Sequence, residues 1–104
     1  MVDTFSSLQR LIAWYLRHCN GDWEHSFGFA IDTLDNPGVS IKIDLQETEL
    51  AHVPFLELKD DYDSPDHWFI CRRTDTMFEA FGAATRLEDM LRIFADWADA
   101  HETI

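Results

Sequence analysis

Basic residues are scarce in this chain. Twenty Asp and Glu residues stand against eight Lys and Arg, so the formal net charge is -12. Proteins that bind a nucleic-acid backbone need clustered Lys and Arg to displace counterions from the phosphates, so we expect no nucleic-acid partner. The excess of negative charge instead favours a basic protein as partner, or serves solubility alone.

Cysteine is scarce as well. The chain has two, Cys19 and Cys71, whereas a small secreted domain held by disulfides carries several closely spaced pairs. We therefore expect a cytoplasmic protein, and the sequence leaves a disulfide between these two residues open. The histidines form no close pair at ligand spacing and no Cys-x-x-Cys is present, which argues against a metal site. Without a glycine-rich phosphate loop, no cofactor is expected.

Long apolar runs are also missing. The longest early run, Leu11–Leu16, is too short to span a membrane and starts too late for a signal peptide. The composition is nevertheless 46% hydrophobic and 13% aromatic, well above that of a chain too polar to collapse. The sequence predicts a single folded domain over residues 1–104, with no membrane partner.

A helix is predicted near the start of the chain, where apolar residues recur at spacings of three and four. The stripe expected to face the core consists of Phe5, Leu8, Leu11, Ile12, Tyr15, Leu16 and Cys19. Trp14 falls on the other side, with Arg10 and Arg17. It therefore needs either a loop that folds over it or a partner.

A second helix is predicted near the end of the chain. Thr85 and Glu88 have the spacing of a capping box, in which both side chains satisfy free backbone N–H groups. The apolar stripe that follows, from Leu87 to His101, has the helical period.

Between the helices, apolar and polar residues alternate with the period of half-buried strands. The five predicted strands are Phe27–Ile31, Val39–Leu45, Phe55–Lys59, His67–Arg73 and Met77–Phe81. The first two form a hairpin, and its turn is expected to use a positive φ at Gly38.

The short connections favour antiparallel pairing of neighbouring strands. Each helix has one apolar stripe and the hairpin has one apolar face. The sequence therefore predicts an α+β fold, a five-stranded antiparallel meander sheet with the N-terminal and C-terminal helices packed on one face. The other face of the sheet is left open.

Negative charge concentrates between Asp44 and Asp66, where eight carboxylates stand against Lys59 alone, a net charge of -7. Acidic residues interleaved with aromatic ones are typical of a docking surface for a basic protein, and a solvated set of loops is the alternative. The candidate partner-binding residues are Asp32, Asp44, Glu47, Glu49, Asp60, Asp61, Asp63, Tyr62 and Trp14.

The triplet Trp23-Glu24-His25 places a carboxylate beside an imidazole, which can act as an acid/base pair. If His25 begins the first strand, however, Glu24 projects from the opposite face. We favour a structural role, in which Trp23 covers the edge of the core and His25 hydrogen-bonds the backbone.

Cys71 is a candidate nucleophile, because the adjacent Arg72 and Arg73 could favour its thiolate. Its place inside an apolar strand instead indicates an inert, buried thiol. A small sulfur-transfer enzyme that uses Cys71 is the alternative to a binding protein. A third alternative is a structural dimer, joined by its sheets or through Trp14.

The stretches "WYLRHC", "GDWEH", "TLDNPG", "HWFIC" and "FADWA" together resemble the immunity protein 53 family, a bacterial group associated with polymorphic toxin systems. The resemblance spans nearly the whole chain. It implies a cytoplasmic, non-enzymatic protein that binds a cognate toxin, and no catalytic residue is assigned. A basic nuclease would suit so acidic an inhibitor. We expect a monomer or a weak homodimer.

One position departs from the family pattern. The family usually has Trp after the glycine of "TLDNPG", where this chain has Val39. If that Trp contacts the toxin, the fit of this chain to its partner differs. If it packs in the core, a neighbouring side chain has grown to fill the space.

Overall fold

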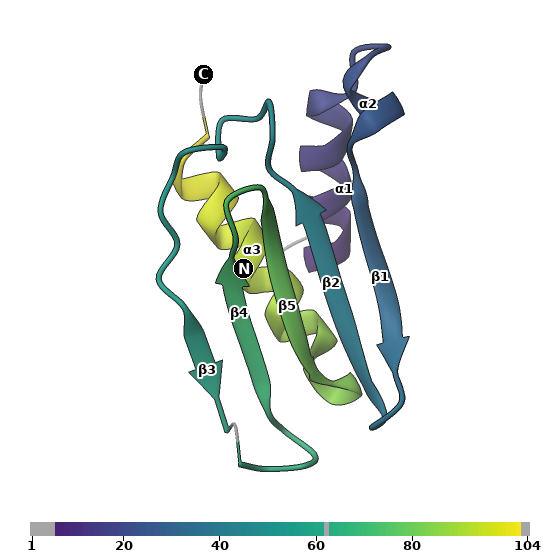
Figure 1. Cartoon of the computed structure of the whole chain (residues 1–104), viewed down its shortest axis with the longest axis vertical. Coiled ribbons are helices and arrows are strands. Elements are labelled where there is room, and N and C mark those ends of the chain that lie inside the picture. The colour runs from purple at the N-terminus through teal and green to yellow at the C-terminus, as the bar shows by residue number, and fades with distance from the viewer. Residues whose placement is uncertain (1–5, 62, 103–104) are drawn as a thin grey trace.

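The structure is a computed structural model that describes residues 6–61 and 63–102 (Figure 1). The elements in chain order are α1 (Ser7–His18), α2 (Trp23–Ser26), β1 (Phe29–Leu34), β2 (Gly38–Asp44), β3 (Leu58–Asp60), β4 (Phe69–Arg73), β5 (Met77–Ala83), the 3-10 turn η1 (Ala84–Arg86) and α3 (Leu87–Ala100). All five predicted strands are present, with shifted boundaries.

The five strands form one antiparallel sheet in the order β1-β2-β5-β4-β3. The predicted α+β class and five-stranded antiparallel sheet are confirmed. The order differs from a simple meander in one connection, because the chain leaves β2 and crosses to the far edge before it forms β3. The two seven-residue strands, β2 and β5, thereby pair with each other at the centre, and the three-residue β3 is left at an edge, where short strands are typical.

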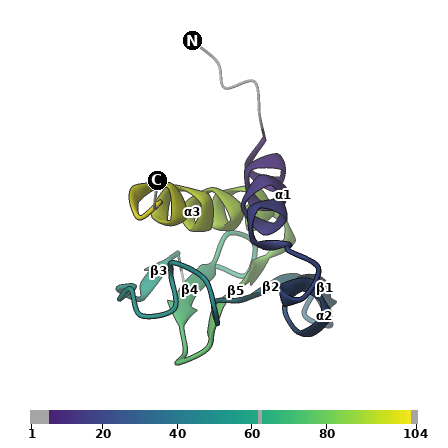
Figure 2. The same cartoon turned by 90° about the horizontal axis from the view of Figure 1, so that it is seen from above.

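Both long helices pack on the same face of the sheet, as predicted (Figure 2). The core between them contains fully buried side chains from the sheet and from each helix, among them Ile41, Phe78, Leu11 and Phe94. Burial of a large apolar side chain contributes about 1.5 to 3 kcal/mol. The opposite face of the sheet is covered by neither helix.

The face that α1 turns to the core differs from the predicted one. Trp14 is 2% exposed, and its ring meets that of Phe94 edge-on at 5.1 Å. Three aliphatic residues of the predicted stripe, Leu8, Ile12 and Leu16, are exposed instead, whereas a fourth, Leu11, is buried as predicted. The predicted face was chosen because it holds more aliphatic residues. In the structure the large indole of Trp14 determines which face of α1 is buried.

The sequence offers Asp3 or Thr4 as the N-cap of the first helix, but both lie outside the described residues, and another residue caps α1. Ser6 is the N-cap, and its hydroxyl accepts a hydrogen bond from the Gln9 backbone N–H at 3.2 Å. The Gln9 side chain accepts in turn from the Ser6 N–H at 2.9 Å, which completes a capping box.

The β1–β2 turn requires glycine for a different reason from the one predicted. A positive φ occurs at Gly21 but not at Gly38. A Cβ at Gly38 would instead lie 2.6 Å from the Gly82 carbonyl oxygen on β5, so the close approach of the central strands excludes a side chain. Val39, the position that departs from the family pattern, is buried in the core.

The crossing connection between β2 and β3 is held by Arg73. Its guanidinium donates to the carbonyl groups of Leu50 and Ala51, each at 2.9 Å, and to that of Val53. Hydrogen bonds from a charged donor contribute more than neutral ones. This arginine therefore fixes the path of a segment that has no strand partner of its own.

Candidate functional site

The densest group of acidic residues lies in the loop that joins β3 to β4. We call residues 60, 61 and 63–68 the acidic loop, because it carries Asp60, Asp61, Asp63 and Asp66. The loop projects beyond the end of the sheet, next to the start of α3 (Figure 1). Its position at an exposed corner makes these carboxylates accessible to a partner.

Two residues of the η1 turn anchor the acidic loop. The Thr85 hydroxyl donates to the Asp66 carbonyl at 2.9 Å, and the Arg86 guanidinium donates to the His67 carbonyl at 2.6 Å. The predicted capping box of Thr85 and Glu88 is therefore wrong, because α3 begins at Leu87 and Thr85 binds the loop instead. Glu88 accepts from the Ser7 hydroxyl at 2.5 Å and so joins the two long helices.

Arg86 also pairs with carboxylates on three sides. Its guanidinium lies 2.7 Å from Asp60, 2.7 Å from Asp89 and 4.0 Å from Asp61, and its carbon lies 4.5 Å from the centre of the Phe69 ring. The hydrogen bond to Asp60, followed by that to Asp89, raises the pKa of Arg86. Two candidate binding residues are thus oriented and partly neutralised from within the chain.

Beyond Arg86 the loop is open to solvent. Asp63 is exposed and lines a shallow pocket of about 310 Å³ with Ser64, Pro65 and Trp68. An indole wall beside carboxylates is the combination of apolar anchor and charged rim that partner-binding surfaces use. Tyr62, which was also predicted to bind a partner, lies outside the described residues.

Three other predicted acids do not join the acidic loop. Asp32 is exposed on β1, the edge strand opposite β3. Asp44 is half-buried at the end of β2, where it accepts a hydrogen bond from the Gly28 N–H at 2.9 Å. Glu47 is exposed in the β2–β3 connection, with φ at 61°. The structure thus distributes these carboxylates over separate parts of the surface.

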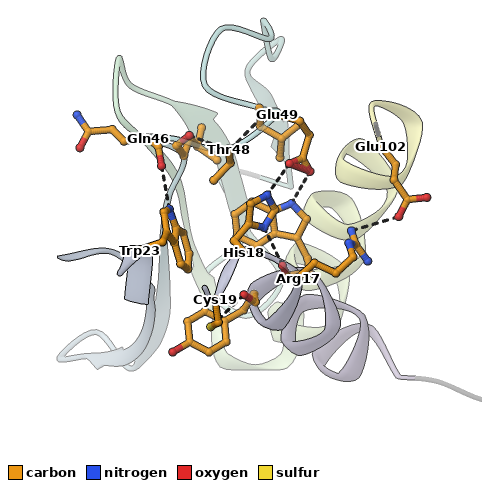
Figure 3. A network of polar contacts seen from close by, with 12 residues as sticks. Arg17, His18, Cys19, Trp23, Gln46, Thr48, Glu49 and Glu102 are labelled. Carbon is orange, nitrogen blue, oxygen red and sulfur yellow. Dashed lines mark hydrogen bonds and ion pairs between the residues drawn. The ribbon is translucent and has the colours of Figure 1, made fainter. Parts of the chain in front are cut away.

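Glu49 and Trp14, both predicted to bind a partner, contact each other inside the molecule, and Figure 3 shows Glu49 beside His18. The Trp14 indole N–H donates to one carboxylate oxygen of Glu49 at 2.9 Å, and His18 Nε2 lies 2.6 Å from the other. A loop therefore covers Trp14. The sequence left two alternatives for this residue, a loop or a partner, and the structure shows the loop. Its side chain offers no surface to a partner. Leu11, Trp14 and His18 follow one another at spacings of three and four residues. This spacing could have predicted that they share the inward face of α1.

The triplet Trp23-Glu24-His25 lies in the short helix α2, so the case in which His25 begins the first strand does not apply. Trp23 is buried at the edge of the core, as predicted, and its indole N–H donates to the Gln46 carbonyl at 3.0 Å. Backbone hydrogen bonds, first from its own N–H and then from those of Asn20 and Gly21, lower the pKa of Glu24. Glu24 thus closes the turn between α1 and α2, where the Asn20 and Gly21 N–H groups donate to its carboxylate.

Cys71 has no access to solvent. The residue is 0% exposed, and burial raises the pKa of its thiol to about 12. Neither neighbouring arginine is directed at the thiol to stabilise a thiolate, since Arg72 pairs with Glu79 at 3.2 Å and Arg73 binds backbone carbonyls. A buried thiol that stays protonated is a poor nucleophile, so the geometry gives the thiol-enzyme alternative no support.

Within residues 6–61 and 63–102, no three His, Cys, Asp or Glu side chains converge to hold a metal ion. No helix in that same part of the chain is long and apolar enough to cross a membrane.

Comparison with known protein families covers most of the chain. The family model for Immunity protein 53 matches residues 8–99, which include β1 to β5 and nearly all of α1 and α3. Neither the curated proteins nor the solved structures gave a significant match. An immunity family implies that its members bind and neutralise a cognate toxin. Since the match covers most of the chain, the protein belongs to the immunity protein 53 family.

Proposed function

We propose that this protein neutralises its toxin by forming a complex with it in the cytoplasm, without chemical reaction. Membership of an immunity family carries this proposal. The buried Cys71 supports a non-enzymatic role, because the strongest nucleophile candidate of the sequence is inaccessible.

The acidic loop is the surface we propose for the toxin. Its carboxylates lie close together in sequence and in space, and hydrogen bonds from Thr85 and Arg86 hold its backbone. A loop that is ordered before binding loses less conformational entropy on association. Asp63 and Asp66 are exposed, and no ion pair within the described residues neutralises either.

The partner that this surface fits is a basic toxin domain, such as a nuclease whose cationic site binds phosphates. Carboxylates can occupy such a site in place of phosphates, and complementary potentials accelerate the encounter. The net charge of -12 extends this attraction over the whole molecule. We therefore propose that negative charge steers association and that the acidic loop makes the contact.

The association rate tests this proposal. The cognate toxin domain, captured by pull-down on the immobilised protein, would be purified in an inactive form, and its association with the immunity protein measured from 50 to 500 mM salt. We expect the association rate constant to fall by about tenfold or more, because salt screens steering between exposed charges. A rate constant that does not change with salt would contradict electrostatic recognition.

A further inference from the structure

The two edges of the sheet differ in how they are protected. Edge strand β3 has only three residues, and two of them, Lys59 and Asp60, are charged. Edge strand β1 has six residues, pairs with β2 without a bulge and carries Asp32 as its one charged residue. Short length, charged residues, proline and bulges prevent the edge of a sheet from pairing with another chain. The edge at β1 has little of this protection, so it can accept a further strand.

The backbone groups of three β1 residues point away from the sheet. The Asp44 N–H donates to the Gly28 carbonyl at 2.9 Å, so these two residues form a hydrogen-bonded pair with β1 on one side and β2 on the other. Such pairs recur at every second residue of an antiparallel ladder, so Ala30 and Asp32 also bond to β2. The residues whose N–H and C=O groups face the open edge are therefore Phe29, Ile31 and Thr33.

This row of backbone groups is complementary to itself. If two β1 strands pair antiparallel with Ile31 at the two-fold axis, Phe29 of each copy lies opposite Thr33 of the other. Every outward N–H then meets an outward C=O of the second copy. A register with Ala30 at the axis leaves Thr33 without a partner in β1, and one with Asp32 at the axis places two carboxylates together. Only the register centred on Ile31 satisfies both the backbone and the charges.

The same register brings together two opposite charges that are unpaired within the chain. Asp32 and Lys42 are exposed on the sheet face opposite the helices, and neither forms an ion pair within residues 6–61 and 63–102. Ala30 pairs with Lys42 and lies opposite Asp32 of the second copy, so the two charged residues are two strands apart, about 10 Å between their Cα atoms. A hollow of about 310 Å³ lies over the small Ala30 side chain, lined also by Lys42 and Asp44. The Asp44 carboxylate accepts from the Gly28 N–H, and Lys42 can extend across the hollow to Asp32 of the second copy.

This charge complementarity selects a second copy as the occupant. Any strand can bond to the outward backbone groups, but a second copy supplies both a carboxylate for Lys42 and a lysine for Asp32 in the register that the backbone requires. We infer that this protein forms a weak homodimer in which two β1 strands pair antiparallel and join the two sheets. The β1 edge and the acidic loop lie on opposite sides of the sheet (Figure 1), so the dimer leaves the acidic loop free. The inference does not depend on the proposed function, because it rests on β1 and β2 alone.

Sedimentation velocity of the full chain between 10 µM and 1 mM tests for the dimer. We expect a dissociation constant of roughly 10 µM to 1 mM, since one strand pair makes a small interface between two chains of net charge -12. Asp32→Lys should weaken the dimer by about tenfold or more, although it reduces the net negative charge, because it places two lysine side chains together. Asp75→Lys is the matched control: it makes the same change of charge at an exposed position of the β4–β5 turn and should not weaken the dimer.

Exchange of the two charges tests the register. Lys42→Asp alone should also weaken the dimer, whereas Asp32→Lys combined with Lys42→Asp should restore it, since each lysine again meets a carboxylate of the other copy. Thr33→Pro removes an outward N–H that does not bond to β2, and proline is tolerated at such edge positions, so this variant should fold as a monomer. Far-UV circular dichroism checks the folding of each variant, and Lys42→Asp replaces any single variant that unfolds.

Amide hydrogen exchange locates the interface. The amides of Phe29, Ile31 and Thr33 should exchange more slowly at 1 mM protein than at 10 µM, whereas those of β3 should exchange equally at both concentrations. A wild type that is monomeric at 1 mM would overturn the inference, and so would a dimer that Asp32→Lys and Lys42→Asp leave intact. Protection of the three β1 amides only when a toxin domain is added would also overturn it, and would assign the edge to a strand of the toxin.

Discussion

His18 and Glu49 meet at 2.6 Å although 31 positions separate them in the sequence. The other ring nitrogen of His18 lies 2.8 Å from the Trp14 carbonyl, so both ends of the imidazole are occupied. This contact attaches the β2–β3 connection to the last turn of α1, as Figure 3 shows. Together with Arg73, it fixes the segment that gives the sheet its crossed strand order.

Replacement of Glu49 should therefore destabilise the fold. Glu49→Ala leaves the Trp14 indole N–H and the His18 ring without their acceptor, and the loss of a partner by a largely buried polar group costs about 1 to 3 kcal/mol per group. The free energy of unfolding in urea measures the effect. Glu47→Ala, an exposed carboxylate in the same connection, should change that free energy by less than about 0.5 kcal/mol. Equal effects of the two substitutions would show that the contacts of Glu49 with Trp14 and His18 contribute nothing to the free energy of unfolding.

The tryptophans should differ in their tolerance of phenylalanine. The Trp97 indole N–H is buried and has no hydrogen-bond partner in residues 6–61 and 63–102, whereas that of Trp23 donates to Gln46. Trp97→Phe removes an unsatisfied donor, while Trp23→Phe removes a satisfied one. We expect Trp23→Phe to cost about 1 kcal/mol more in unfolding free energy than Trp97→Phe. A larger cost for Trp97→Phe would indicate a partner for its N–H, such as a bound water.

The two cysteines should react at different rates. Cys19 is half-buried and its thiol donates to the Tyr15 carbonyl at 3.4 Å, whereas Cys71 has no exposure. At pH 8 a thiol with a pKa of about 12 is ionised in only about one molecule in 10,000. We expect one thiol to be alkylated in the folded protein and two in denaturant, as counted by mass spectrometry. Rapid labelling of Cys71 in the folded protein would reopen the thiol-enzyme alternative.

The same buried thiol predicts how stability depends on pH at the alkaline end. Folding raises the pKa of Cys71 from an ordinary value of 9.0 to about 12, so above pH 9 the unfolded chain releases a proton that the folded chain keeps. The contribution of this group is full below pH 9 and is lost as the pH rises toward 12. Urea unfolding of Cys71→Ala should show a smaller decline between pH 9 and 10 than the wild type shows. An identical decline would contradict the assignment.

Arg86 should control the order of the acidic loop. Its guanidinium spans Asp60, Asp89 and the His67 carbonyl, and a lysine ammonium cannot reach three such groups at once. Arg86→Lys should therefore speed amide hydrogen exchange in the acidic loop by about tenfold, because the local opening free energy falls. Arg92→Lys, at a half-exposed arginine that binds Asp89 and forms no hydrogen bond or ion pair with the acidic loop within the described residues, should leave that exchange unchanged. Unchanged exchange in Arg86→Lys would show that the loop is held by other contacts.

The hydrophobic periods were sufficient to predict the class of fold. Alternation located the strands, and the stripes of the two helices placed both on one face of the sheet. The strand order could not be predicted from these periods, because it depends on Arg73 and Glu49, which bind partners more than twenty positions away in the sequence. The orientation of α1 was mistaken because Leu8, Ile12 and Leu16 have the spacing of a buried stripe and yet face solvent.

The candidate site was predictable in part. The acidic loop follows from charge density alone, and the structure places Asp60, Asp61 and Asp63 on one exposed corner. The burial of Glu49 could not be read from charge, because a carboxylate enters the interior only when specific donors meet it, here Trp14 and His18. Whether the exposed carboxylates bind a toxin depends on a partner that the sequence does not encode.

Survival of cells that express the toxin tests the central claim most directly. The cognate toxin domain would be induced together with the wild type, with Asp63→Lys/Asp66→Lys, or with Asp22→Lys/Asp75→Lys. The two variants change net charge equally, but Asp22 and Asp75 are exposed in α2's cap and the β4–β5 turn, at the end of the sheet away from the acidic loop. We predict survival with the wild type and the Asp22/Asp75 variant, and death with the folded Asp63/Asp66 variant. Full protection by the Asp63/Asp66 variant would contradict the assignment of the acidic loop.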